Sequence, residues 1–111
     1  MKKETLTLSS SKGEKKIEKN KILFCKQYLV GTLIELNDGN HYLLKERLNE
    51  LRNFLDGPSF FMISSRELIN LEYMQAVFSE EIVMVNNKII KVGGMRKEML
   101  VKKIWEEAWI Q

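Results

Sequence analysis

Residues 60–74 read FFMISSRELINLEYM, and the order of apolar and polar side chains in this stretch carries most of the information about the fold. The apolar run at residues 60–63 has the length of a buried strand. The polar residues 64–67 separate it from a second apolar group at residues 68–74, which fits either a strand or one helical turn. The stretch therefore predicts a strand, an exposed connection and a second short element.

The segment before it has a helical period. Four leucines recur at spacings of three and four and predict one amphipathic helix over residues 45–55: Leu44, Leu48, Leu51 and Leu55. Gly57 and Pro58 end this helix. Its charged residues belong on the outer face: Glu46, Arg47, Glu50 and Arg52.

The rest of the chain is mostly strand-like. Runs of strand length occur at residues 5–8, 21–25, 32–36, 41–44, 76–78, 82–85 and 89–92. Turn signals separate them at residues 9–13, 37–40 and 86–87, and Asp-Gly is among the strongest of these. About eight or nine short strands, one central helix and one terminal helix are expected.

The terminal helix is predicted from Arg96 to the end of the chain. Its apolar residues form two neighbouring stripes: Leu100, Ile104 and Ala108, and beside them Val101, Trp105 and Trp109. The tryptophan stripe is expected in the core, and a partner or dimer face is the alternative.

Size and composition predict one domain, residues 1–111, because domains of about 100–150 residues are common. No run reaches the ~18 consecutive apolar residues of a membrane helix, and Met1-Lys2-Lys3 leads into no signal peptide. A single cysteine excludes an intrachain disulfide and suits a reducing compartment. A cytoplasmic protein without membrane association is therefore expected.

Charge is uneven along the chain. Residues 1–26 hold eight lysines against three glutamates, whereas residues 27–111 hold ten Lys or Arg against twelve Asp or Glu. A basic edge suits an acidic polymer. The alternative is that these lysines protect edge strands from pairing with other chains.

Catalytic and metal-binding patterns are missing from the sequence. Cys25 lies inside an apolar run and is interpreted as a small core residue, and His41 as a surface residue beside a turn. No histidine or cysteine spacing suits a transition metal, and Gly93-Gly94 lacks the pattern of a phosphate-binding loop. The chain is predicted not to be an enzyme and to need no cofactor or metal.

From Ile22 to Ile104 the order of these features resembles the LytTR family, the DNA-binding output domain of bacterial response regulators. The carrying motifs are the apolar strand Ile22–Phe24, the helix motif Leu48-Asn49-Glu50-Leu51 and the block Phe61 to Asn70. A strand pair over residues 82–92 and a final amphipathic segment follow in the family's order.

The resemblance implies a mainly β fold, an elongated multi-strand sheet or sandwich with one short central helix and a C-terminal helix. It implies regulation of transcription by sequence-specific binding of double-stranded DNA. Loops would enter successive major grooves, and two copies can occupy paired direct repeats as a homodimer. The 111 residues hold no receiver domain of ~120 residues, so a stand-alone regulator would take its signal input from abundance, a ligand or a regulatory protein partner. The alternative is that the sequence is a fragment of a longer regulator.

Three positions carry DNA contacts in the family: the loop after the first apolar strand, the Asn after the aliphatic pair, and a basic segment after the last strand. The residues expected to contact DNA are Lys26, Gln27, Tyr28, Ser64, Ser65, Arg66, Asn70, Lys91, Arg96 and Lys97. Asn pairs with adenine and Arg with guanine in the major groove, whereas lysines contact phosphates.

The chain departs from the family pattern in its basic segment. Gly93-Gly94-Met95 stands where Ser-Arg-Arg is usual, and Arg96 follows one place later. Asn70 has an alternative role as the cap of a short turn, and Arg96 an alternative role in opening the last helix. The second functional hypothesis is accordingly a degenerate domain that contacts proteins and binds DNA weakly or without specificity.

Overall fold

The computed structural model describes residues 5–10 and 13–110, and the side chains of residues 6, 8–10, 15 and 107–110 lie outside that description. Its strands are β1 (Thr5–Ser10), β2 (Gly13–Glu18), β3 (Ile22–Tyr28), β4 (Gly31–Leu36), β5 (His41–Leu44), β6 (Phe60–Ser64), β7 (Glu67–Asn70), β8 (Met74–Val77), β9 (Glu81–Met84) and β10 (Ile89–Lys91). The helices are α1 (Leu48–Leu51) and α2 (Gly94–Ile110), with 3₁₀ turns at Lys19–Lys21 and Leu71–Tyr73.

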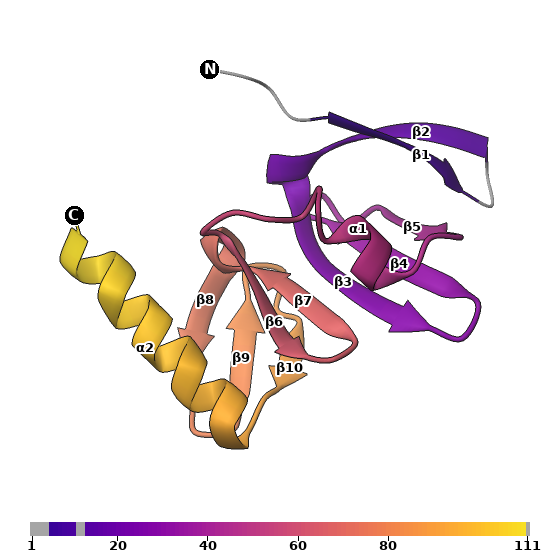
Figure 1. Cartoon of the computed structure of the whole chain (residues 1–111). Helices are drawn as coiled ribbons and strands as arrows, with labels where there is room; N and C mark the ends of the chain where they lie inside the picture. Colours follow the sequence, from indigo (N-terminus) through magenta and orange to yellow (C-terminus); the bar gives the residue numbers. More distant parts are fainter. Residues whose placement is uncertain (1–4, 11–12, 111) are drawn as a thin grey trace.

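The strands form two antiparallel sheets (Figure 1). A seven-stranded sheet has the order β2-β1-β5-β4-β3-β7-β6, and a three-stranded sheet has the order β10-β9-β8. Helix α2 lies beside the three-stranded sheet and β6 (Figure 1). The whole molecule measures 40 × 35 × 24 Å. The mainly β architecture with two helices is the one predicted.

Strand β3 belongs to two hydrophobic cores, which explains why its first four residues are all buried. Ile22 and Cys25 pack with the leucines of α1 in one core. Leu23 and Phe24 pack with β9, β10 and α2 in the other. Adjacent residues of a regular strand point to opposite faces, but the pairing of β3 with β4 has a register shift between Ile22 and Phe24. This irregularity lets Leu23 and Phe24 enter the same core.

The central helix is shorter than the predicted 45–55. Residue 47 still has extended backbone angles, and helical geometry is confined to Leu48–Leu51. The Thr32 hydroxyl donates to the Glu46 carbonyl over 2.7 Å, which ties that oxygen to β4 instead of to a helix. All four leucines of the pattern are nevertheless buried, so the prediction of a core stripe is confirmed.

Two further expectations were incomplete. Residues 13–18 form the separate edge strand β2, which pairs with β1 over its full length, although its charged residues concealed a strand pattern. The ambiguous residues 68–74 divide between the end of β7, a 3₁₀ turn and the start of β8.

The terminal helix begins at Gly94, two residues before the predicted start, and Leu100 is fully buried. Trp105 is 59% exposed, so its predicted place in the core is wrong. The side chain of Trp109 lies outside the described part. Leu100 and Ile104 contact the second core, whereas Trp105 is one residue further round the helix.

Candidate nucleic-acid interface

The three segments expected to contact DNA lie along one edge of the molecule. They are the β3–β4 turn at the right of Figure 1, the β6–β7 turn below its centre and the junction between β10 and α2 at its bottom. Two hydrogen bonds connect them. The Gln27 backbone N–H donates to the Arg66 carbonyl over 2.8 Å, and the Arg96 guanidinium donates to the Met62 carbonyl over 2.9 Å.

The β3–β4 turn is a two-residue tip with apolar side chains. Leu29 is 94% exposed and Val30 71% exposed, and Tyr28 beside them is exposed as well. Gly31 follows with φ +149°, and a Cβ there would stand 2.0 Å from the Leu44 carbonyl oxygen. Only glycine therefore allows β4 to start so close to β5.

Lys26 and Tyr28 form one small group on this hairpin. The Lys26 ammonium lies 5.4 Å from the centre of the Tyr28 ring and 3.8 Å from a Glu67 carboxylate oxygen. The lysine is half-buried and the tyrosine exposed, so both reach the surface beside the β6–β7 turn.

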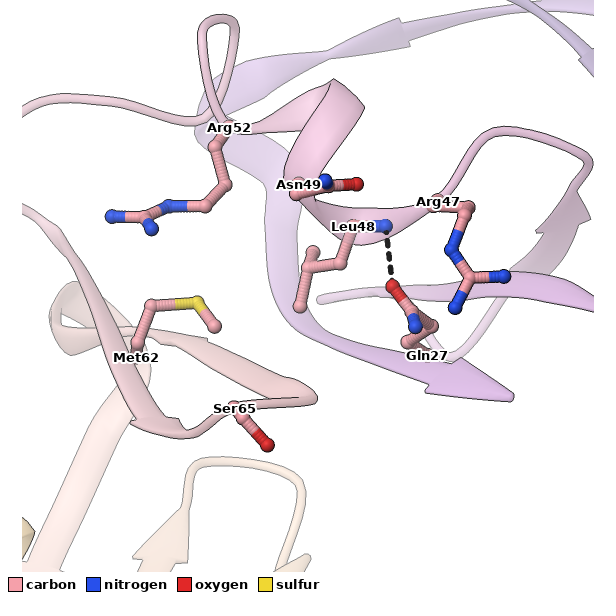
Figure 2. Close-up of a pocket in the computed structure, with 7 residues that line it drawn as sticks. All are labelled: Gln27, Arg47, Leu48, Asn49, Arg52, Met62 and Ser65. Carbon is pink, nitrogen blue, oxygen red and sulfur yellow. Dashed lines mark hydrogen bonds between the residues drawn. The ribbon is translucent and has the colours of Figure 1, made fainter. Parts of the chain in front are cut away.

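Gln27 has a structural role that the sequence did not indicate. Its side-chain oxygen accepts a hydrogen bond from the Leu48 N–H over 2.9 Å (Figure 2). Arg47, the residue before α1, has no side-chain acceptor that could cap the helix. The Glu50 carboxylate accepts a hydrogen bond from the Arg47 backbone N–H over 2.7 Å. Two side chains, one of them from β3, thus satisfy backbone donors at the start of this short helix.

The β6–β7 turn exposes Ser65 and Arg66. Ser64 holds the turn from inside, because its hydroxyl donates to Glu67 over 2.9 Å and accepts from the Arg66 N–H over 3.2 Å. The turn therefore presents one hydroxyl and one guanidinium to solvent from a backbone that is fixed on both sides.

Asn70 does not belong to this exposed group. Its side chain is 1% exposed, its amide N–H donates to the Ile22 carbonyl over 2.8 Å, and its oxygen accepts from the Glu72 N–H over 3.0 Å. The alternative interpretation of Asn70 as a turn cap is the correct one. A base contact by this side chain is wrong for this structure, because both of its polar atoms face the protein interior.

The basic segment after β10 is split. Lys91 is exposed on β10, opposite Glu81 of β9, and Lys97 is half-buried in the first turns of α2. Arg96 is exposed, and its bond to Met62 joins α2 to β6. Arg96 does not open the last helix, because α2 begins at Gly94 and Arg96 is its third residue.

Two arginines beside these residues were not among the expected contacts. Arg47 and Arg52 line a depression of about 260 Å³ together with Gln27 and Ser65 (Figure 2). The sequence placed both on the outer face of a helix but gave no reason to join them to the two turns. That link depends on how β3 and β6 pack beside α1, which is a tertiary property.

The N-terminal lysines, apart from Lys26, are elsewhere. Among the described ones, Lys16 is exposed on β2, at the upper side of Figure 1 and away from the three turns, Lys19 and Lys21 lie in the 3₁₀ turn after β2, and Lys26 on β3 belongs to the interface. Strand β2 is an edge strand of the seven-stranded sheet. Protection of that edge by charge is therefore the interpretation that fits.

The remaining chemical candidates have structural positions. Cys25 is buried in the first core, as predicted, and burial raises the pKa of its thiol far above the usual range. His41 is exposed beside the β4–β5 turn. Within residues 5–10 and 13–110 no three His, Cys, Asp or Glu side chains gather as metal ligands would, and no described helix has the length and apolarity to cross a bilayer.

Comparisons with known proteins agree on one family. The model of the LytTr DNA-binding domain matches residues 12–105. The LytTr DNA-binding domain of a response regulator described as methyl-accepting/DNA, from Bacillus cereus, has a similar structure, with a TM-score of 0.78 at 18% identity over 93% of this chain and 98% of that chain. A comparison with curated protein sequences gives no match. The chain is a member of the LytTr family of DNA-binding domains.

Proposed function

We propose that this domain binds duplex DNA sequence-specifically, with its three turns in the major groove, and regulates transcription in this way. DNA binding and transcription regulation are the general properties of the family. The observation that carries the finer proposal is the alignment of the β3–β4 turn, the β6–β7 turn and the β10–α2 junction along one edge, joined by two hydrogen bonds.

In this proposal the exposed turn residues meet bases and the cations around them meet phosphates. Ser65 and Arg66 have the polar groups and the exposure for base contacts. Lys26, Lys91 and Lys97 neutralise phosphates, and Tyr28 adds a contact next to Lys26. Ser64, Gln27 and Asn70 act mainly by holding the turns, since their side chains have partners inside the domain.

The apolar tip of the β3–β4 turn suits a thymine. Leu29 and Val30 offer no hydrogen-bonding side chain, and an aliphatic residue in the major groove contacts the thymine methyl group. Polar turn residues are the usual choice in a hairpin, so turn chemistry does not account for these two side chains. An A·T pair opposite the tip follows from this assignment.

A second function is favoured by one observation on α2. Met95 and Met99, one turn apart on this helix, and Trp105 further round it are all exposed, and together they offer apolar contacts to another protein. A regulatory partner or a second copy of the domain on paired direct repeats would use these contacts while the three turns hold DNA.

The decisive experiment is selection of the purified domain against random-sequence duplex DNA at ~50 and ~200 mM salt. A recovered motif and an affinity that falls steeply with salt are expected. We expect Arg66→Glu to abolish this binding and to leave the circular dichroism spectrum unchanged, because Arg66 is exposed and its side chain makes no hydrogen bond or ion pair with the described residues.

The outcome that overturns the proposal is weak binding without a motif. Trp105→Ala separates the second function, because it would weaken a protein complex and leave the affinity for the selected DNA unchanged. Arg96→Glu is a secondary probe, since its loss also removes the bond to Met62.

A further inference from the structure

Two open depressions lie next to each other beside α1. The first, of about 260 Å³, is lined by Arg47, Arg52 and Met62, and the second, of about 340 Å³, by Arg52, Met62 and Arg96. Arg52 and Met62 line both, so the two depressions are adjacent, and together they are called the groove here. The groove passes between α1 and β6, beside the β6–β7 turn.

Three guanidinium groups border this groove without a carboxylate partner. Among the residues that the structure describes, no Asp or Glu oxygen lies within salt-bridge distance of Arg47, Arg52 or Arg96. The carboxylate that does line the groove, Asp56, is paired with Lys19 at 3.1 Å. The groove therefore carries an uncompensated positive charge, which favours an anion.

The arginines are spaced along the groove and do not converge on one point. Figure 2 shows Arg47 and Arg52 on either side of Leu48, with Met62 and Ser65 across the depression from α1. Arg96 is held at the far end by its 2.9 Å bond to the Met62 carbonyl. Spaced cations over an apolar floor of Leu48 and Met62 suit an extended polyanion better than one small anion.

We infer that this groove seats the sugar-phosphate backbone of one DNA strand, with Arg47, Arg52 and Arg96 contacting separate phosphates. The inference rests on the proposed function and adds the path of the DNA. The strand runs past α1 from the β3–β4 side to the start of α2, parallel to the line of the three turns. Planar guanidinium groups match phosphate oxygens in two-point contacts, which fixes the position of the domain on the duplex.

The test compares alanine variants of the two unexpected arginines with matched surface controls. Arg47→Ala, Arg52→Ala and the double variant are titrated with the selected duplex and a mismatched duplex at several salt concentrations. Lys16→Ala on β2 and Lys102→Ala on α2 remove one exposed charge each outside the groove. Arg47 and Arg52 are exposed, so their alanine variants should keep the wild-type stability. Thermal unfolding of every variant checks this.

Each arginine variant is expected to bind both duplexes several-fold more weakly. The slope of log affinity against log salt should become shallower by about 0.9 for each lost contact, whereas the controls keep the wild-type slope. A duplex with single methylphosphonate substitutions then locates the phosphates. Neutralising a contacted phosphate should weaken the wild type and leave the matching arginine variant unaffected.

Two results would overturn the inference, and they differ. If the double variant shows the same salt slope and the same response to methylphosphonates as the wild type, the groove does not bind the DNA backbone, and the proposed function still stands. If the wild type binds no duplex, both the proposed function and the inference about the groove are excluded.

Discussion

At the scale of single residues, Asn70 shows a polar side chain used for architecture. Its amide joins the β7 end to the Ile22 carbonyl and caps the following 3₁₀ turn at Glu72. We expect Asn70→Ala to lower the free energy of unfolding by about 1–3 kcal/mol, because a buried carbonyl and a backbone N–H lose their partner. Urea unfolding measures this loss.

The matched control is Ser65→Ala on the neighbouring turn. Ser65 is exposed, so this variant should keep the wild-type stability within about 0.5 kcal/mol and change DNA affinity instead. An Asn70→Ala protein as stable as the wild type would contradict the capping role.

Leu29 gives a residue-level prediction about base recognition. Replacing the thymine opposite the tip by deoxyuridine removes one methyl group and should weaken wild-type binding roughly fourfold, since burial of a methyl group contributes about 0.8 kcal/mol. Leu29→Ala should bind the two duplexes equally. Titration of both proteins with both duplexes forms a double-mutant cycle. Equal discrimination by wild type and variant would exclude the contact.

At the scale of elements, α1 is a four-residue helix that depends on its neighbours. Leu48 and Leu51 are buried in the first core, and the side chain of Gln27 reaches from β3 to its first N–H. A helix this short has little stability of its own. Its position beside the candidate groove is therefore set by β3.

Two substitutions of Gln27 separate capping from DNA contact. Gln27→Leu removes the acceptor and should cost about 1 kcal/mol of stability. Gln27→Glu keeps an acceptor oxygen, so stability should be retained while affinity for DNA falls through repulsion of phosphate. Unfolding curves and titrations of both variants provide the readout. A Gln27→Leu protein with wild-type stability would exclude the cap.

Local patterns predicted most of these elements, and the failures have tertiary causes. The Asp38-Gly39 turn, the apolar run in β3 and the leucine stripe all follow from neighbours in sequence. The start of α1 was misplaced because Thr32, a residue of another strand, holds the Glu46 carbonyl. Long-range contacts of this kind leave no periodicity in the segment itself.

In the candidate site, too, features with a local sequence pattern were predictable and those set by tertiary contacts were not. The β6–β7 turn could be located from the polar step between two apolar runs, whereas the β3–β4 turn, with its apolar tip, was expected only from the family resemblance. The burial of Asn70 could not be predicted, because an Asn that ends a strand has the same local pattern whether it faces solvent or the Ile22 carbonyl. Arg47 and Arg52 required knowledge of which strand packs beside α1.

At the scale of the whole molecule, β3 connects the two hydrophobic cores. Ile22 and Cys25 contribute to one, and Leu23 and Phe24 to the other. If either core opened, two of the four buried residues of β3 would be exposed to water. The two halves of the domain are therefore expected to unfold together, and the three turns keep their relative positions as long as the domain is folded.

The buried thiol of Cys25 makes the free energy of unfolding depend on pH, which gives a test of whether the two cores unfold together. Burial raises the pKa of its thiol, whereas an unfolded thiol ionises near pH ~8.5. Above that pH the unfolded state binds fewer protons than the folded state, so stability falls with rising pH, by at most about 1.4 kcal/mol per pH unit. At pH 7 both states keep the proton, and the contribution of the thiol is fully present.

Urea unfolding of the wild type and Cys25→Ala between pH 7 and 10 tests this linkage. At pH 7 the variant should be less stable, because it loses a buried sulfur in the first core. Lysines and tyrosines titrate in both proteins, so the difference between the two curves isolates the thiol. That difference should narrow above pH ~8.5. Parallel curves up to pH 10 would mean that the thiol ionises equally in the folded protein, and that the core around β3 opens without global unfolding.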